Sequence, residues 1–156
     1  MQHFHPDGTM PSDHTRALAE DLRRTLPFED DRDFEEAHRG FVARPDYDRI
    51  MADAGNVAWD MGRYEFLLRD EDFDSIHPSL QRQAVLNMAY GLYEVVPGIW
   101  QVRGFDLSNV TFVRGETGWI VFDTATAVET ARAAHALINQ HVEDLPVSAV
   151  IHSHSR

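Results

Sequence analysis

The spacing of apolar and polar residues changes character near Gly91. Before this glycine, apolar positions recur at helical intervals, for example at Leu18 and Leu22, and polar residues or prolines mark the segment ends. After it, short apolar runs alternate with Pro-Gly and Gly-rich turns, a pattern typical of β-strands. The pattern predicts an α+β chain in which a helical first half leads into a sheet-bearing second half.

End signals in the first half predict four segments before residue 70. Ser12 is a suitable cap for a helix that runs to about Leu26, and a second helix is expected over residues 30–39. The acidic residues near the start of this second helix favour a solvated helix start over a metal site. A short hairpin is expected over residues 49–59, followed by a short helix over 62–68.

His77 and Pro78 open a further helix, for which Gly91 is the expected C-terminal cap. His77 is interpreted as a structural residue at the helix start rather than a ligand. The apolar face of this helix is expected to pack in the core through residues four positions apart, namely Leu80, Ala84 and Met88.

The second half predicts four strands followed by a helix and a last strand. The strands are expected over residues 92–95, 99–102, 109–113 and Trp119–Phe122. The last of these is continuously apolar, so we expect it to be buried on both faces. Val147–Ile151 is expected to be a final, buried strand.

The helix before the final strand has its own start signal. Thr126 and Glu129 stand three positions apart, as the two partners of a capping box do. Its apolar face is expected to contain Ala127, Ala131, Ala134 and Ile138.

Charge and cysteine content exclude several classes of function. The 156 residues carry 14 Lys+Arg against 26 Asp+Glu, a formal net charge of −12, which disfavours binding to nucleic acid or to an anionic membrane surface. Without cysteine there are no disulfides or thiolate sites, so His, Asp and Glu remain as metal ligands. No apolar run is long enough for a membrane span, and no signal peptide is visible, so a cytoplasmic location is expected.

His152 and His154 follow the final strand and are the main candidate ligands. Side chains two positions apart on a strand point the same way, so both imidazoles could reach one metal ion. Spacing alone does not decide this, because His3 and His5 have the same spacing in a polar segment without a strand pattern. Histidines that are merely solvated or hydrogen-bonded at a strand end remain the alternative.

Residues 98–124 resemble the start of a metallo-β-lactamase-fold domain, and His152-Ser-His154 falls where that superfamily places its H-x-H-x-D-H motif. More narrowly, the segments at residues 78–87, 101–109 and 117–124 resemble zinc-dependent alkyl sulfatases, which cleave linear alkyl sulfate detergents. The resemblance runs from about Phe28 to His154.

The resemblance implies a fold and a division of the chain. We expect an N-terminal helical segment followed by the first half of a metallo-β-lactamase-like αββα sandwich, truncated. The corresponding parts are a flexible arm over residues 1–12, a mostly helical extension over 13–90, and the start of the sandwich over 91–156, cut within the motif.

The resemblance also implies roles for individual residues. His152 and His154 correspond to two ligands of the first of two Zn²⁺ ions. Asp123 corresponds to an aspartate beside the metal site that anchors the histidine loop, although an Asp that closes a strand and starts an Asp-Thr turn is an equally ordinary interpretation. Arg156 is a departure, because the family has an aspartate ligand of the second zinc there.

Other family ligands are expected downstream: the histidine that ends the motif, two glutamates and a further histidine. We therefore expect the family chemistry, dinuclear zinc hydrolysis of linear primary alkyl sulfates to alcohol and sulfate, but an inactive chain in isolation. The resemblance further implies a homodimer, and full-length relatives can be periplasmic or secreted.

Two alternatives remain open. One is a non-catalytic remnant or partner-binding fragment. The other is a different metallo-β-lactamase-fold hydrolase acting on thioesters or lactams, which the helical first half disfavours.

Overall fold

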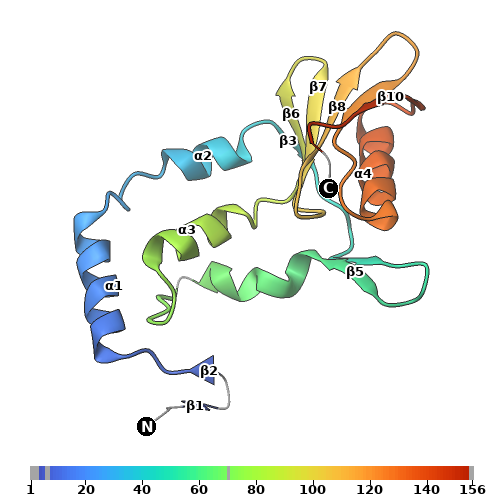
Figure 1. Ribbon diagram of the computed structural model, residues 1–156. Coiled ribbons are helices and arrows are strands. Elements are labelled where there is room, and N and C mark those ends of the chain that lie inside the picture. The colour runs from blue at the N-terminus through green and yellow to red at the C-terminus, as the bar shows by residue number, and fades with distance from the viewer. Residues whose placement is uncertain (1–3, 6–7, 70, 155–156) are drawn as a thin grey trace.

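The structure, a computed structural model, describes residues 4–5, 8–69 and 71–154 (Figure 1). Helices form a frame on one side of the molecule and a sheet with one covering helix forms the other (Figure 1). The helices are α1 (Asp13–Thr25), α2 (Arg32–His38), the 3-10 helix η1 (Met61–Arg69), α3 (Pro78–Leu86) and α4 (Val128–His141). The strands outside the main sheet are β1 (Phe4–His5), β2 (Gly8–Thr9), β4 (Arg49–Met51) and β5 (Val57–Asp60).

The main sheet has the strand order β10-β9-β8-β7-β6-β3. Its members are β3 (Phe41–Ala43), β6 (Gly91–Val96), β7 (Ile99–Arg103), β8 (Val110–Arg114), β9 (Trp119–Phe122) and β10 (Val147–Ile151). Neighbouring strands are antiparallel except β9 and β10, which are parallel and are connected through α4. This mixed architecture confirms the expected α+β fold class.

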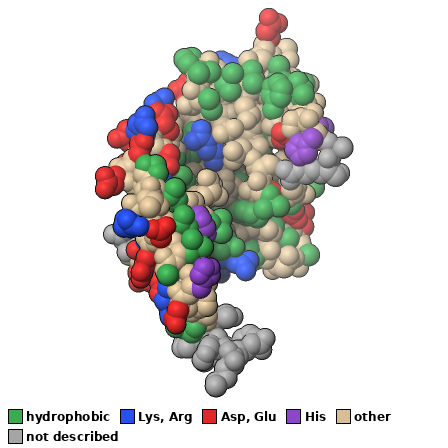
Figure 2. Space-filling model, turned by 60° about the vertical axis from the view of Figure 1, so that its left-hand side comes forward, with side chains coloured by type: hydrophobic (Ala, Val, Ile, Leu, Met, Phe, Trp, Pro, Cys, Tyr) green, Lys and Arg blue, Asp and Glu red, His purple; other side chains and the backbone are tan. Residues whose placement is uncertain are grey.

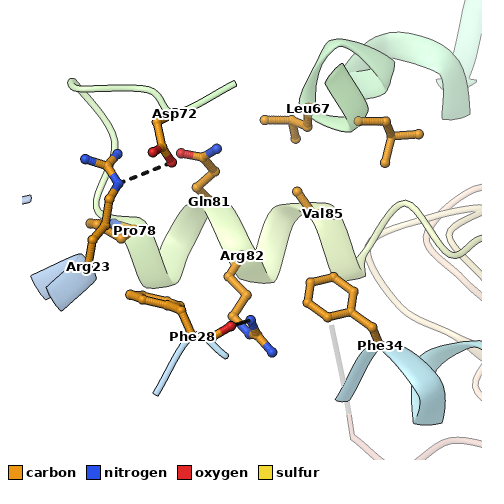
Figure 3. A pocket seen from close by; sticks show the side chains of 10 residues that line it. Arg23, Phe28, Phe34, Leu67, Asp72, Pro78, Gln81, Arg82 and Val85 are labelled. Atoms are coloured by element: carbon orange, nitrogen blue, oxygen red, sulfur yellow. Dashed lines mark hydrogen bonds and ion pairs between the residues drawn. The ribbon is translucent and has the colours of Figure 1, made fainter. Parts of the chain in front are cut away.

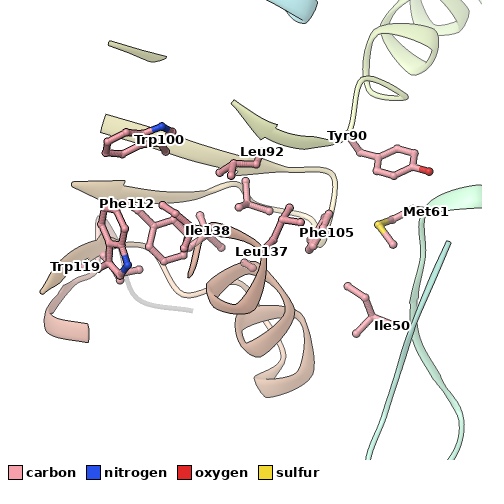
Figure 4. Packing of buried hydrophobic residues seen from close by; sticks show 14 residues of the cluster. Ile50, Met61, Tyr90, Leu92, Trp100, Phe105, Phe112, Trp119, Leu137 and Ile138 are labelled. Atoms are coloured by element: carbon pink, nitrogen blue, oxygen red, sulfur yellow. The ribbon is translucent and has the colours of Figure 1, made fainter. Parts of the chain in front are cut away.

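The core lies between α4 and one face of the sheet (Figure 4). Trp119 is fully buried, and its ring packs edge-on against those of Trp100 and Phe112, with centroids 5.6 and 6.1 Å apart. The indole Nε1 of Trp119 donates a hydrogen bond of 2.8 Å to Oδ1 of Asn139 on α4. This bond satisfies the polar atom of an otherwise apolar side chain and fixes the helix against β9.

Part of the helical frame is joined by Arg82 of α3, which is drawn with the cavity beside it in Figure 3. Its guanidinium pairs with Asp33 of α2 at 2.5 Å and donates to the carbonyl oxygens of Phe28 and Asp30. It also lies over the ring of Phe34, 4.6 Å from the centroid. Because a planar guanidinium can serve all these partners at once, one side chain joins α2, α3 and the segment before α2.

The short helix expected over residues 62–68 is present as the 3-10 helix η1 over residues 61–69. Two other expectations for the first half need correction. Leu80 is not in the core, since 62% of it is exposed, whereas Met88 is buried. Gly91 is not the cap of α3, which ends at Leu86; it is the first residue of β6, with φ of 138°. Here its missing Cβ allows the carbonyl of Ala43 on β3 to approach.

The expected capping box of α4 is also wrong. The N-cap residue is Ala127, which makes no side-chain cap, and Thr126 bonds elsewhere. The buried residues of α4 are Thr130, Ala134, Leu137 and Ile138, so the buried face is rotated from the expected one. Thr126 lies one residue before the cap position and donates its hydroxyl to Asp106.

Burial of the last two strands differs from expectation. In β9, Trp119 and Val121 are buried under α4, but Phe122 is 37% exposed, so the strand is covered fully on one face only. Every residue of β10 is exposed. An apolar run therefore marks the strand correctly without showing how many faces are covered.

The first half contains strands as well as helices. The pair β1–β2 lies within the expected flexible arm, parts of which fall outside the described residues, and β3 joins the main sheet next to β6. The ends of α1, α2 and the β4–β5 hairpin agree with expectation. The division into arm, helical extension and sandwich start remains a proposal.

We predict that Gly104→Ala is more destabilising than Gly98→Ala. Both glycines have positive φ, 75° and 88°, so both substitutions incur the left-handed penalty of about 1–2 kcal/mol. Only at position 104 would the added Cβ collide with Cβ of Tyr90, which should add roughly 1–3 kcal/mol. Urea unfolding followed by tryptophan fluorescence measures both losses, and equal losses would contradict the role given to Tyr90.

Candidate functional site

The candidate site lies where β9 and β10 end. Because these strands are parallel neighbours, their carboxyl ends lie side by side at the same end of the sheet. Phe122 pairs with Ile151 as the last partners of the ladder, and the amide of Asp123 donates to the carbonyl oxygen of Ile151 at 3.0 Å. The pairing therefore sets Asp123 beside the loop that begins at His152.

Asp123 holds this loop through Ser153. One carboxylate oxygen accepts the Ser153 amide at 2.9 Å, and the other accepts the Ser153 hydroxyl at 2.8 Å. The same hydroxyl lies 2.8 Å from Nδ1 of His154. The bonds from the Ser153 amide and hydroxyl, together with the nearby imidazoles of His154 and His152, lower the pKa of Asp123. The carboxylate thus fixes the residue that separates the two histidines.

The turn after Asp123 has an unusual backbone. Asp123 and Ala125 have φ of 59° and 63°, and among the described residues they are the non-glycine positions with positive φ. A left-handed alanine costs about 1–2 kcal/mol relative to its right-handed form. Such conformations persist where surrounding contacts enforce them.

Asp106, in the loop between β7 and β8, supplies those contacts. Only 6% of it is exposed, and its carboxylate accepts four hydrogen bonds. The donors are the amide and hydroxyl of Thr126 at 2.9 and 2.6 Å, the hydroxyl of Thr130 at 2.6 Å and the amide of Leu107 at 2.6 Å. Burial raises the pKa of Asp106, but the bonds from Thr126, Thr130 and Leu107 outweigh it, so the pKa is lowered.

Sequence reasoning did not assign a role to Asp106. The available signal was an aspartate in a short loop after a strand, combined with two threonines four positions apart near a helix start. That combination is common in turns, and only the strand pairing shows that the loop and the helix start meet.

The donor set suits zinc in kind but is incomplete in number. Neutral imidazoles are good zinc ligands, and both His152 and His154 are exposed at the sheet edge. Within residues 4–5, 8–69 and 71–154, no group of three or more His, Asp or Glu side chains is close enough to hold a metal ion. The described residues therefore fit one part of a metal centre.

The other candidates are placed as follows. Arg156, the expected departure from the motif, lies outside the described residues, as does His3 of the comparison pair. His77 is the N-cap of α3, and its Nδ1 accepts the Ser79 amide at 3.2 Å, so its structural role is confirmed.

A cavity of about 530 Å³ opens next to the loop of Asp106. It lies between η1, the end of α3 and the β7–β8 loop, and its lining is largely apolar and aromatic. The side chains include Trp59, Met61, Tyr64, Met88, Tyr90 and Leu107. Leu107 is 80% exposed and projects from the β7–β8 loop.

On the face shown in Figure 2, the arginines of the described residues are scattered, and those along the left-hand side lie among acidic side chains. Among the described residues no helix is long and apolar enough to cross a membrane.

Comparison with known proteins gives a consistent result. Residues 103–155 match the model of the metallo-beta-lactamase superfamily. The chain is 44% identical over 149 residues to an (R)-specific secondary-alkylsulfatase of Pseudomonas sp., covering 96% of the chain and 22% of that protein. It is 43% identical over 145 residues to a linear primary-alkylsulfatase of Pseudomonas sp., covering 92% and 22%.

The solved structure of a stereoselective inverting sec-alkylsulfatase from Pseudomonas sp. superposes with a TM-score of 0.86 at 45% identity. The match covers 93% of this chain and 23% of that one. The chain thus spans about a fifth of the length of the curated relatives it matches. The resemblance to alkyl sulfatases with a metallo-β-lactamase fold is confirmed over this part.

We predict that Asp106→Asn lowers the free energy of unfolding by about 1–3 kcal/mol at pH 7, because the new amide nitrogen cannot accept two of the hydrogen bonds. The folded-state pKa of Asp106 is lowered, so its contribution is present above the unfolded pKa of about 3.9 and is lost as the pH falls through the folded value.

Urea unfolding between pH 7 and pH values below about 4 checks this, since the gap between the two proteins should narrow there. Asp46→Asn, at an exposed position before β4, serves as the control and should show little difference at any pH. A gap for Asp106→Asn that stays constant with pH would contradict the ionised carboxylate as its source.

Proposed function

We propose that this chain is the part of an alkyl sulfate ester hydrolase that supplies two histidine ligands, His152 and His154, to a zinc centre. The observation that carries the proposal is the parallel β9–β10 pair, which sets Asp123 beside the histidine loop in a chain 43–44% identical to alkylsulfatases. When bound, a zinc pair supplies an activated water and neutralises negative charge on the sulfate ester.

The chain's own residues have defined tasks in this proposal. His152 and His154 present neutral imidazoles at the end of β10. Asp123 restrains the backbone between them by accepting the Ser153 amide and hydroxyl. This restraint reduces the entropy lost when the two rings are held for a metal ion.

The described residues do not complete the centre, because catalytic zinc sites use at least three protein ligands. We therefore propose that the chain by itself has no sulfatase activity and that further ligands come from other sequence. An aspartate is the family residue where Arg156 stands, so we also propose that Arg156 is incompatible with the second zinc.

The substrate we propose is a linear primary alkyl sulfate of the dodecyl sulfate type, which would make the protein a detergent-degrading enzyme. The cavity beside Leu107 is of a size that accommodates small ligands, and its apolar and aromatic side chains suit a hydrocarbon chain, although Asp60, Arg103 and Asp106 also line it. The net charge of −12 gives an anionic substrate no long-range attraction, so its binding would depend on local positive charge.

Further expectations stay proposals: a homodimeric assembly, no nucleic-acid partner, and a cytoplasmic location, with a periplasmic or secreted one for full-length relatives. The division into residues 1–12, 13–90 and 91–156 belongs with them.

We predict that the chain binds Zn²⁺ only weakly, in the micromolar range or above, because two imidazoles form an open site. Isothermal titration calorimetry should show that His152→Ala/His154→Ala abolishes this binding. The matched control is His3→Ala/His5→Ala, which removes the same spacing elsewhere in the chain and should leave it unchanged. The reverse result would assign the metal to the N-terminal pair.

We predict that a chimera restores the chemistry. This chain would replace the matching segment of the Pseudomonas linear primary-alkylsulfatase, with Arg156→Asp in one version and Arg156 kept in the other. Sulfate release from dodecyl sulfate, followed by ion chromatography with and without a chelator, should occur only in the Asp version, because Arg adds a positive charge where a ligand is needed.

The unmodified chain should release no sulfate, and His152→Ala/His154→Ala in the Asp chimera should remove the activity. A folded chimera that cleaves thioesters or lactams but no alkyl sulfate would overturn the substrate class. Sulfate release by the unmodified chain, lost with His152→Ala, would overturn the proposal that its site is incomplete.

A further inference from the structure

We infer that Asp106 is a positioning residue for the zinc-binding loop and acts through Thr126 and Asp123; the inference rests on the proposed metal site. Asp106 lies in the β7–β8 loop, whereas the histidines follow β10. Its effect would pass through two successive contacts, each of which the structure records.

The first contact fixes the turn after β9. Asp106 accepts both the amide and the hydroxyl of Thr126, so it binds the backbone directly after the left-handed Ala125. Thr130 donates to the same carboxylate from the first turns of α4, which anchors Asp106 to the helix. Because the turn is held at its far end, the unfavourable backbone angles between residues 123 and 125 are stabilised.

The second contact transmits this restraint to the histidines. Asp123 is held on one side by its own amide bond to Ile151 and on the other by the turn that Asp106 fixes. Both oxygens of Asp123 then meet Ser153, the residue between His152 and His154. If the turn relaxed to right-handed angles, the direction of the Asp123 side chain would change, and the Ser153 amide would lose its acceptor.

Burial makes Asp106 suited to this task. The side chain is 6% exposed and its carboxylate is served by four donors, so the carboxylate has little freedom to rotate. A group that is buried and fully hydrogen-bonded holds its partners more rigidly than an exposed one does. Thr126, by contrast, is exposed, so it can be changed with little effect on the core.

The first experiment uses the metal-free chain. The amide proton resonance of Ser153, measured by NMR, should move in Asp106→Asn and Thr126→Val toward its position in Asp123→Ala, which removes the acceptor. Thr126→Ser keeps the hydroxyl and should leave the resonance in place. Leu67→Ala, which creates a cavity at a buried position in η1, controls for lost stability and should also leave it in place.

The second experiment measures Zn²⁺ affinity by calorimetry on the same variants. Asp106→Asn and Thr126→Val should weaken binding about 10-fold, whereas Thr126→Ser and Leu67→Ala should bind like the parent chain. If Asp106→Asn does not fold, Thr126→Val decides the question.

The metal site and the positioning role of Asp106 are tested by different outcomes. Equal Zn²⁺ binding by the parent and His152→Ala/His154→Ala would overturn the metal site, while the Ser153 resonance would still test the restraint. Zinc binding that depends on the histidines, together with an unmoved Ser153 resonance in Thr126→Val and Asp106→Asn, would overturn the positioning role alone.

Discussion

Because β9 and β10 are parallel neighbours, the chain between them must return from the carboxyl end of β9 to the start of β10, and α4 makes this crossing. The crossing helix covers Trp119 and Phe112 and so creates the core on one face of the sheet. The same pairing brings the carboxyl ends of both strands together, and there the Ser153 amide donates to Asp123. Core and candidate site thus have one cause, the parallel ladder.

The strands of the second half could be predicted because their apolar runs are short and are bounded by turn residues such as Pro97-Gly98. The helix caps were less predictable. Thr126 has the chemistry of a cap, but the helix begins one residue later, and the Thr126 amide and hydroxyl both donate to a buried carboxylate from another loop. Leu80 fits a helical core stripe, yet α3 packs through other residues and leaves it exposed.

For the site, the histidine pair after the final strand was enough to single out His152 and His154, and the family resemblance pointed to Asp123. The bonds that join Asp106, Thr126 and Thr130 could not be predicted, since they depend on which loops the sheet brings together. A pattern along one segment carries no information on its partner 20 residues away. That His152, His154 and Asp123 serve a metal ion remains a prediction.

The sheet also has an order in which it can assemble. β6, β7, β8 and β9 follow one another through short hairpin connections, whereas β3 and β10 join the two edges from more distant parts of the chain. Local pairings close small loops and form early, and distant ones form later because closing a long loop costs more entropy. The central four strands would then fold before β10 docks. The loop with His152 and His154 would take shape only in that late step, so metal ions would meet an already folded sheet rather than a collapsing chain.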